Sequence, residues 1–398
     1  MSYDVYKILV IFATLVGLVT YTDCNVDVLR LQPTPLVVDQ NYNIVYHTTP
    51  LQRNEKIHIC CPGNSVIYNG ELMNVECLSL NYLDDDEFEA NEKIYLFNDF
   101  KCQQIPRHSV KYNKKTCENG GTEIEIGYDL KSIFVVQITV CFDNNNLTPI
   151  YSYYNITKTI GYRDGKVPRV SFEENGFYTI STSLDRLYER NAEIKTINTL
   201  LSLNINSEKY IKRNGDLFIN RGHLAAKGDF VYSFQQLATF QYVNSAPQWA
   251  SFNGGNWNEV EINIRDYAMS KDVNLEIYTG VYGISTLPNE KNNAPTNLYL
   301  FTDNNKNLIP VPLLFWKVAY NRKVKQGVVI VGINNPYITN ISEHIICEDI
   351  WNKIQWFNSK LSKYRQNVNF GYTYACSVPD FRTVIKECPD IDVHELLQ

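Results

Sequence analysis

Cysteine placement most constrains what this chain can fold into, because ten cysteines are spread unevenly over 398 residues. Seven lie before residue 142 and three lie after residue 346. In an oxidising compartment such a set forms disulfides, and no pair has the CxxC spacing of a zinc site. Since both groups are odd in number, we expect one disulfide between the two halves. The cysteines are Cys24, Cys60, Cys61, Cys77, Cys102, Cys117, Cys141, Cys347, Cys376 and Cys388.

The N-terminus has the layout of a cleaved secretory signal. An apolar run over residues 8–20 follows Lys7, and small or polar residues lead to Cys24. The alternative is a membrane anchor, but the run is shorter than the ~20 residues that a membrane span needs. We therefore expect residues 1–24 to be removed, a secreted product and no membrane partner. Three glycosylation acceptor triplets agree with this route, at Asn146, Asn155 and Asn340.

The first half contains short runs typical of strands, separated by clusters of Asn, Gly, Pro and Asp. They predict a small β-rich, disulfide-stapled module over residues 25–164. A polar stretch with glycine and proline, 161–168, marks the boundary to a second domain over 165–398. The strand-like runs are Leu36–Val38, Lys56–Ile59, Lys93–Phe97 and Ile133–Val140.

The second half alternates helical and strand patterns, which predicts an α+β domain. Residues 185–201 have the pattern of a helix, whereas 216–219 and 328–333 have the pattern of strands. The net charge of −6 excludes a protein that coats nucleic acid by overall charge, because such binding requires Lys and Arg to displace counterions. Any nucleic-acid contact must therefore be local.

The sequence Arg221-Gly-His223 follows the first of these strands. A histidine with an ordinary pKa of ~6.5 is largely neutral near pH 7, so His223 is a candidate general base. Arg221 lies two residues earlier, which on a continuing strand places it on the same face. Its planar guanidinium suits a phosphate oxygen. A base and an anion clamp would then converge, although an isolated Arg-Gly-His triplet is usually only a turn.

Residues 253–268 have the pattern of an amphipathic helix. Asn253, Glu261 and Arg265 lie along one side of it at ~100° per residue. An amide oxygen is a hard neutral ligand for Mg²⁺, and a nearby carboxylate can hold the metal's water molecules. The arrangement predicts one hydrated metal ion, Mg²⁺ or alternatively Mn²⁺, with Asn253 as the direct ligand. The packing stripe of this helix is Trp257, Val260, Ile264 and Ala268.

These motifs together resemble the DNA/RNA non-specific endonucleases of the ββα-metal type, and among them the secreted gut and salivary members of arthropods. The resemblance covers roughly residues 165–380. It rests on Arg221-Gly-His223-Leu-Ala-Ala-Lys227 and on Asn244-x-x-Pro-Gln248 followed by Asn253-x-Gly-x-Trp257-x-x-x-Glu261. It implies a ββα-metal domain with a central mixed or antiparallel sheet flanked by helices.

The resemblance also implies roles. His223 matches the general base and Asn253 the metal ligand, while Glu261 matches the carboxylate that holds metal-bound water. Arg221 and Arg265 match residues that stabilise phosphate charge, and Asn244 matches a polar residue supporting the site. Gln248 belongs to the same motif. One departure is Asn220, where many members carry aspartate; asparagine keeps an acceptor oxygen but loses the negative charge.

The expected activity is Mg²⁺-dependent hydrolysis of DNA, with RNA as a second substrate. Cleavage should show little sequence preference and leave 5′-phosphate ends. Binding would use phosphate contacts, and no obligate protein partner is expected. Two settings fit the resemblance: saliva that degrades host extracellular DNA during feeding, or a gut nuclease that digests double-stranded RNA and DNA. A catalytically silent secreted binding protein on the same scaffold is the alternative from another functional class.

Overall fold

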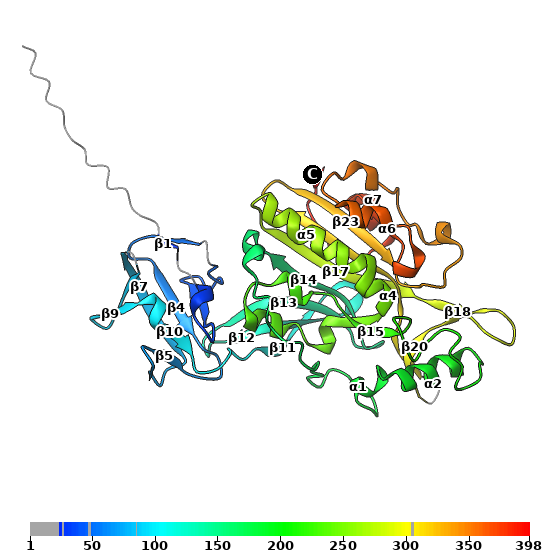
Figure 1. Cartoon of the computed structure of the whole chain (residues 1–398), viewed down its shortest axis with the longest axis horizontal. Helices are drawn as coiled ribbons and strands as arrows, with labels where there is room; N and C mark the ends of the chain where they lie inside the picture. The colour runs from blue at the N-terminus through cyan, green and yellow to red at the C-terminus, as the bar shows by residue number, and fades with distance from the viewer. Residues whose placement is uncertain (1–23, 26–27, 47–48, 85, 304–305) are drawn as a thin grey trace, which may run out of the picture.

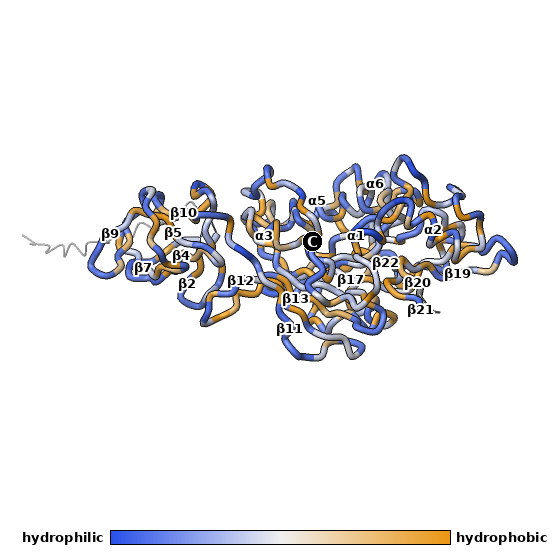
Figure 2. The backbone as a smooth tube through the Cα atoms, turned by 90° about the horizontal axis from the view of Figure 1, so that it is seen from below, coloured by the Kyte–Doolittle hydropathy of each residue, from blue (hydrophilic) through white to orange (hydrophobic). Residues whose placement is uncertain are grey.

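The computed structural model describes residues 24–25, 28–46, 49–84, 86–303 and 306–398. The expected signal segment lies outside these residues, apart from Cys24. The described chain forms two parts side by side along its long axis, a smaller N-terminal part and a larger α+β part (Figure 1). Figure 2 shows hydrophobic and hydrophilic stretches alternating along the backbone in both parts, as expected for strands with one buried face.

The N-terminal part spans residues 24–102 and is built from β-strands, which confirms its predicted β-rich character. An antiparallel sheet has the order β2-β4-β7-β8-β9, and a smaller sheet has the order β10-β5-β6. The strands are β1 (Cys24–Asn25), β2 (Leu36–Asp39), β3 (Pro50–Leu51), β4 (Lys56–Cys60), β5 (Val66–Tyr68), β6 (Glu71–Leu72), β7 (Cys77–Asp84), β8 (Glu87–Ala90), β9 (Lys93–Leu96) and β10 (Phe100–Cys102).

The larger part is organised by a nine-stranded sheet in the order β11-β12-β13-β14-β17-β22-β23-β24, with β25 pairing with β23. All its pairs are antiparallel except β23 with β25, so the predicted mixed sheet is confirmed. The strands are β11 (Ser109–Thr116), β12 (Thr122–Asp129), β13 (Phe134–Asp143), β14 (Thr148–Ile156), β17 (Leu275–Ile284), β22 (Pro312–Asn321), β23 (Gln326–Ile333), β24 (Thr373–Cys376) and β25 (Glu395–Leu396).

This sheet crosses the boundary expected at residues 164–165. Strand β14 pairs with β17, so that Tyr151 lies opposite Gly280 and Ile156 opposite Leu275. Strands β11–β14, which were expected in the N-terminal module, therefore hydrogen-bond into the sheet of the second half. We propose that the division between the two parts lies at residues 103–108.

Helices and short strand pairs surround the sheet. The predicted helix 185–201 is present but breaks at Tyr188 and Glu189. The helices are α1 (Leu184–Leu187), α2 (Arg190–Leu200), α3 (Ser233–Ala238), α4 (Ala250–Phe252), α5 (Asn258–Ser270), α6 (Ser359–Tyr364) and α7 (Val378–Val384). The remaining strands are β15 (Ile219–His223), β16 (Ser245–Trp249), β18 (Thr286–Pro288), β19 (Pro295–Asn297), β20 (Tyr299–Asp303) and β21 (Lys306–Pro310).

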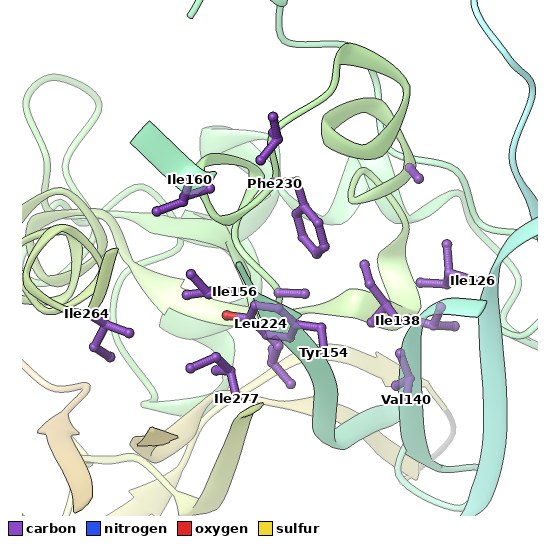
Figure 3. Packing of buried hydrophobic residues seen from close by; sticks show 14 of the residues in the cluster. Ile126, Ile138, Val140, Tyr154, Ile156, Ile160, Leu224, Phe230, Ile264 and Ile277 are labelled. Carbon is purple, nitrogen blue, oxygen red and sulfur yellow. The ribbon is translucent and has the colours of Figure 1, made fainter. Parts of the chain in front are cut away.

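Side chains of the sheet alternate between two cores. Along β22, Phe315 and Ala319 belong to the core that includes helix α5, whereas Trp316, Val318 and Tyr320 belong to the opposite core. Figure 3 shows part of the first core, with side chains of the sheet beside the ββα residues Leu224 and Ile264. The same alternation turns Lys317 toward the first core, where it becomes part of the candidate site.

A ββα unit lies on this face of the sheet. Strand β15 pairs antiparallel with β16, which leads through α4 and a wide π-type turn, η7 (Asn253–Trp257), into α5. The strand predicted at residues 216–219 in fact begins at Ile219 and ends at His223. The predicted packing stripe of the helix is confirmed, since all four of its side chains are fully buried.

The described cysteines form four disulfides, Cys60–Cys77, Cys61–Cys102, Cys117–Cys141 and Cys347–Cys376. None of these joins the two halves, so the expected disulfide between them is wrong. The odd downstream cysteine, Cys388, is instead a buried free thiol. Its burial raises the pKa of that thiol to about 12, so it remains protonated and unreactive at neutral pH. Among the described helices none has the length and apolar character needed to span a membrane.

Candidate active site

His223 ends strand β15 opposite Ser245. Its ring lies between Phe172 and Phe240, with ring centroids 4.9 and 5.0 Å away. Nε2 is buried and has no hydrogen-bond partner among the described residues. Burial lowers the pKa of His223 to about 3, and the positive charges of Arg169 and Lys227 act in the same direction. The imidazole is therefore neutral at physiological pH, which is the form that accepts a proton.

Gly222 allows the two strands of the ββα unit to lie close together. A Cβ atom at this position would lie 2.3 Å from Oε1 of Gln248, a distance that atoms do not reach. Gln248 is fully buried, and neither its amide oxygen nor its amide nitrogen has a hydrogen-bond partner in the described chain. The glycine between Arg221 and His223 is thus required by packing against Gln248.

Arg221 and His223 both contact the ring of Phe172, as expected for residues two apart on one strand. Its Nε donates to the hydroxyl of Tyr242 at 2.8 Å, and Nη2 donates to Oδ1 of Asp185 at 2.7 Å. Nη1 forms no hydrogen bond with the described residues. The guanidinium is therefore held in a fixed orientation with one nitrogen available to an anion.

Asn253 begins the wide turn η7, and its partly exposed amide has no hydrogen bond to any described residue. Gly255 makes this turn possible, because a Cβ there would lie 2.9 Å from the carbonyl oxygen of Phe370. In a regular helix Asn253 and Glu261 would be offset by about 80°. The turn is interrupted at Gly255, whose backbone is not helical (φ −93°, ψ −122°), so the directions of the two side chains are not set by helix periodicity.

Glu261 lies on α5 and has no hydrogen bond within the described structure. Burial raises the pKa of Glu261 to about 7, and Asp229 acts in the same direction, while the cations Lys317, Arg265 and Arg169 oppose the shift. Its carboxylate is thus surrounded by charges of both signs but directly bonded to none.

Arg265, one turn further along α5, forms a buried ion pair with Asp229, with Nη1 and Oδ1 2.6 Å apart. The second carboxylate oxygen of Asp229 accepts the hydroxyl of Tyr154 at 2.6 Å. Lys317 is fully buried and donates to the same hydroxyl at 2.8 Å. The four side chains form one network, in which Asp229 is the acceptor of both a cation and a phenol.

Asn244 lies behind the site and is fully buried. Its amide nitrogen donates to the carbonyl oxygens of Ala225 and Thr239, both at 3.0 Å. Its amide oxygen accepts the N–H of Ala225 and the hydroxyl of Ser152, both at 2.9 Å. Asn244 therefore has every hydrogen-bonding group satisfied, and it fixes the backbone directly after His223.

Two site residues were missed by the sequence analysis. Arg169 is exposed, yet its positive charge lowers the pKa of both His223 and Glu261. It stands in an irregular segment with no motif of its own. Lys317 was missed although a lysine inside a strongly apolar strand signals a buried charge with a partner.

The structure thus brings the predicted residues into three groups. His223 and Arg221 share one aromatic wall, Glu261 and Arg265 lie with Asp229 and Lys317, and Asn244 supports the backbone between them. Arg169 links the first two groups electrostatically. The free amide of Asn253 and the unbonded carboxylate of Glu261 are oxygen donors of the kind that a hydrated Mg²⁺ takes, so these residues fit a divalent metal ion.

Comparison with known proteins gives the site its context. A model of the DNA/RNA non-specific endonuclease family matches residues 119–381. A salivary endonuclease of Lutzomyia longipalpis is 29% identical over 333 residues, which cover 83% of this chain and 73% of the relative. Salivary protein Tsal1 of Glossina morsitans morsitans is 22% identical, over 87% of this chain and 84% of its own length.

A solved structure is also similar, that of an EndoG/EndoGI complex. It matches with a TM-score of 0.35 and 20% identity, over 50% of this chain and 72% of that chain. The family match, by contrast, covers more than half of this chain and contains the whole ββα unit with β15, β16 and α5. The chain therefore belongs to the DNA/RNA non-specific endonuclease family.

Proposed function

We propose that this protein is a secreted, Mg²⁺-dependent endonuclease that hydrolyses phosphodiester bonds of DNA, and of RNA, with little sequence preference. Membership of the family implies a nucleic-acid substrate and a divalent metal ion. The observation that carries the finer proposal is the neutral imidazole of His223, whose buried Nε2 has no partner in the described chain, beside the bound guanidinium of Arg221.

In this mechanism His223 takes a proton from the water molecule that attacks phosphorus. The low pKa of its imidazole keeps the base unprotonated before substrate binds. An incoming phosphate offsets the charges of Arg169 and Lys227, which raises the basicity of His223 at the moment when a proton is released. The base is therefore strengthened by the substrate itself.

Arg221 and Arg169 bind the phosphate on which negative charge grows in the transition state. Arg221 is oriented in advance by Tyr242 and Asp185, so little rearrangement accompanies the reaction. Arg265 acts on the site through Asp229 and keeps Nη1 engaged there. These contacts reach phosphate rather than base edges, which is the physical reason for weak sequence preference.

Asn253 would hold the metal ion and Glu261 would hold its water molecules. When bound, such a cation stabilises negative charge on the phosphate and on the departing 3′ oxygen. We propose that cleavage leaves 5′-phosphate and 3′-hydroxyl ends. Four cations act on Glu261 and His223, namely Arg169, Lys227, Arg265 and Lys317, whereas the whole chain has a net charge of −6. Nucleic acid is therefore attracted only near the site, and its binding should weaken steeply as salt is added.

The relatives from Lutzomyia longipalpis and Glossina morsitans morsitans are named as salivary proteins. Together with four described disulfides, this supports a secreted enzyme, and we propose that it degrades host extracellular DNA during feeding. Digestion of plasmid DNA by the purified protein with Mg²⁺, with chelator, and with a His223→Ala variant tests the proposal. Intact plasmid in all three samples would instead indicate a binding protein on a nuclease scaffold.

A further inference from the structure

A cavity of about 1090 Å³ lies between the N-terminal part and the large sheet. This is larger than the ~300–1,000 Å³ of ordinary ligand pockets, and junctions between domains are frequent binding sites. The two parts contact each other at its wall, where the rings of Tyr46 and Tyr232 stack with centroids 5.7 Å apart. Gln235 also donates to the hydroxyl of Tyr46 at 3.1 Å.

The lining of this cavity is rich in uncharged amides and aromatic rings. Four of its five charged residues pair with each other: Lys158 with Asp272 at 3.0 Å, and Arg322 with Glu276 at 2.7 Å. Amides bond to hydroxyl groups as donors and acceptors, and flat rings pack against the apolar faces of sugar rings. The cavity therefore suits a neutral, hydroxyl-rich ligand. Two of its amides, Asn41 and Asn155, form no side-chain hydrogen bond with the described residues, whereas Asn43, Gln137, Asn274 and Asn321 each bond within the chain already.

One lining residue, Asn155, is itself a glycosylation acceptor in the triplet Asn155-Ile-Thr157. It is exposed on β14, whereas its neighbours Tyr154 and Ile156 point into the core. Its side-chain amide has no hydrogen-bond partner among the described residues, so a sugar on Nδ2 would displace no contact.

The other two acceptor asparagines are already engaged. Asn146 donates from Nδ2 to Oδ2 of Asp143 at 2.6 Å. The side-chain oxygen of Asn340 accepts the hydroxyl of Ser342 at 2.7 Å, and its Nδ2 donates to Glu343. Neither residue lines the cavity. Asn155 thus differs from both in having a free amide that faces a large polar space.

We propose that Asn155 carries an N-linked glycan whose first sugars occupy this cavity and brace the two parts of the chain. In the modification Nδ2 forms a bond to the anomeric carbon of N-acetylglucosamine. The bond from that carbon to the diphosphate of a lipid-linked oligosaccharide donor breaks, and the amide proton leaves with the lipid diphosphate. The inference requires entry into the secretory route but is independent of nuclease activity.

Peptide mapping tests the modification. The full chain is secreted from insect cells behind a proven leader, and the peptide containing Asn155 is analysed before and after peptide N-glycosidase treatment. We expect this peptide to carry N-acetylglucosamine-based glycan in the secreted protein and to lose it in an Asn155→Gln variant. Secreted protein in which Asn155 is wholly unmodified would overturn the proposal.

Limited proteolysis tests the position of the glycan. Arg107 is exposed in the connection between the two parts, so trypsin cleavage after it reports on their relative motion. We expect Asn155→Gln to be cut there several-fold faster than the wild type, and an Asn340→Gln control to be cut at the wild-type rate. Equal rates for all three proteins, with Asn155 glycosylated, would show that the glycan lies outside the cavity. Plasmid digestion should be unchanged in both variants.

Discussion

The carboxylate of Glu193, on helix α2, accepts the backbone N–H of Ile219 at 3.0 Å and thereby ties that helix to the first residue of strand β15. The same strand ends at His223. The other oxygen of Glu193 is buried without a partner among the described residues. A buried acid with one hydrogen bond thus holds the strand that carries the proposed general base.

This acid should make stability depend on pH. Burial raises the pKa of Glu193 from 4.5 to about 8, so the folded protein retains a proton that the unfolded chain releases. The stabilisation is therefore present at acid pH and lost as the pH rises from 4.5 to 8, at ~1.4 kcal/mol for each pH unit at most. We expect Glu193→Gln, which keeps an acceptor for Ile219, to melt at a higher temperature than the wild type at pH 8 but not at pH 4.5.

Glu189→Gln is the matched control for this prediction, because Glu189 is exposed one residue before the same helix. Its melting temperature should follow the wild type across the whole pH range. If the melting temperatures of Glu193→Gln and the wild type differed by the same amount at pH 4.5 and at pH 8, the assigned protonation of Glu193 would be contradicted.

His223→Ala should remove the general base and leave binding intact. The expected loss in kcat is ~10²–10⁴, the usual contribution of a positioned base. Binding of a DNA duplex is measured by fluorescence anisotropy in the presence of a chelator, which prevents cleavage. The affinity should change little, because the phosphate contacts belong to arginines. His344→Ala, a substitution outside the ββα unit, serves as control. Equal activity of the His223→Ala protein would refute the assignment.

Arg169→Ala should raise the pKa of His223 and lower activity together. Arg169 holds the pKa of that imidazole down, so removing its charge raises the pKa. Losing one charged transition-state contact typically costs ~10²-fold in kcat. The pKa is measured by proton NMR of the imidazole and the activity by plasmid digestion. Arg163→Ala, at another exposed arginine of the same segment, should alter neither quantity.

The site was predictable from sequence where spacing alone fixes the neighbours. His223 and Arg221 are two residues apart on one strand, so their common face follows from strand geometry. The stripe from Trp257 to Ala268 follows from helix periodicity in the same way. Asn253 was harder to place, because the wide turn at Gly255 depends on the carbonyl oxygen of Phe370, more than a hundred residues away.

Partners from distant strands could not be read from the sequence. Lys317 meets Tyr154 and Asp229 only because β14, β17 and β22 are neighbours in the sheet. The same pairing of β14 with β17 is the basis of our proposal that residues 109–156 lie outside the N-terminal part. Cysteine parity likewise gave a wrong disulfide, since parity carries no information about a thiol buried in a core, as Cys388 is.

Asn253→Ala should raise the Mg²⁺ concentration that the enzyme needs for activity far more than Asn258→Ala does. Asn258, the first residue of α5, serves as the control. Asn253 has a free amide oxygen, and its removal deletes the proposed direct ligand. We expect the Mg²⁺ concentration for half-maximal activity to rise at least ~100-fold, and Glu261→Gln to raise it ~10–100-fold, as losses of groups that hold metal-bound water do. Isothermal titration with Mg²⁺ checks the binding directly. Unchanged affinity in Asn253→Ala would exclude it as the ligand.

Asn244→Ala should destabilise the fold rather than remove a reacting group. The substitution leaves two carbonyl oxygens and an N–H unpaired in a fully buried place, at Ala225 and Thr239. Each unsatisfied group costs ~1–3 kcal/mol, so the free energy of unfolding should fall by at least ~3 kcal/mol. Urea denaturation followed by tryptophan fluorescence measures it. Ser152→Ala removes only one of the same hydrogen bonds, and its loss should be ~1 kcal/mol. A stable Asn244→Ala protein with greatly reduced kcat would mean that Asn244 acts on the substrate instead.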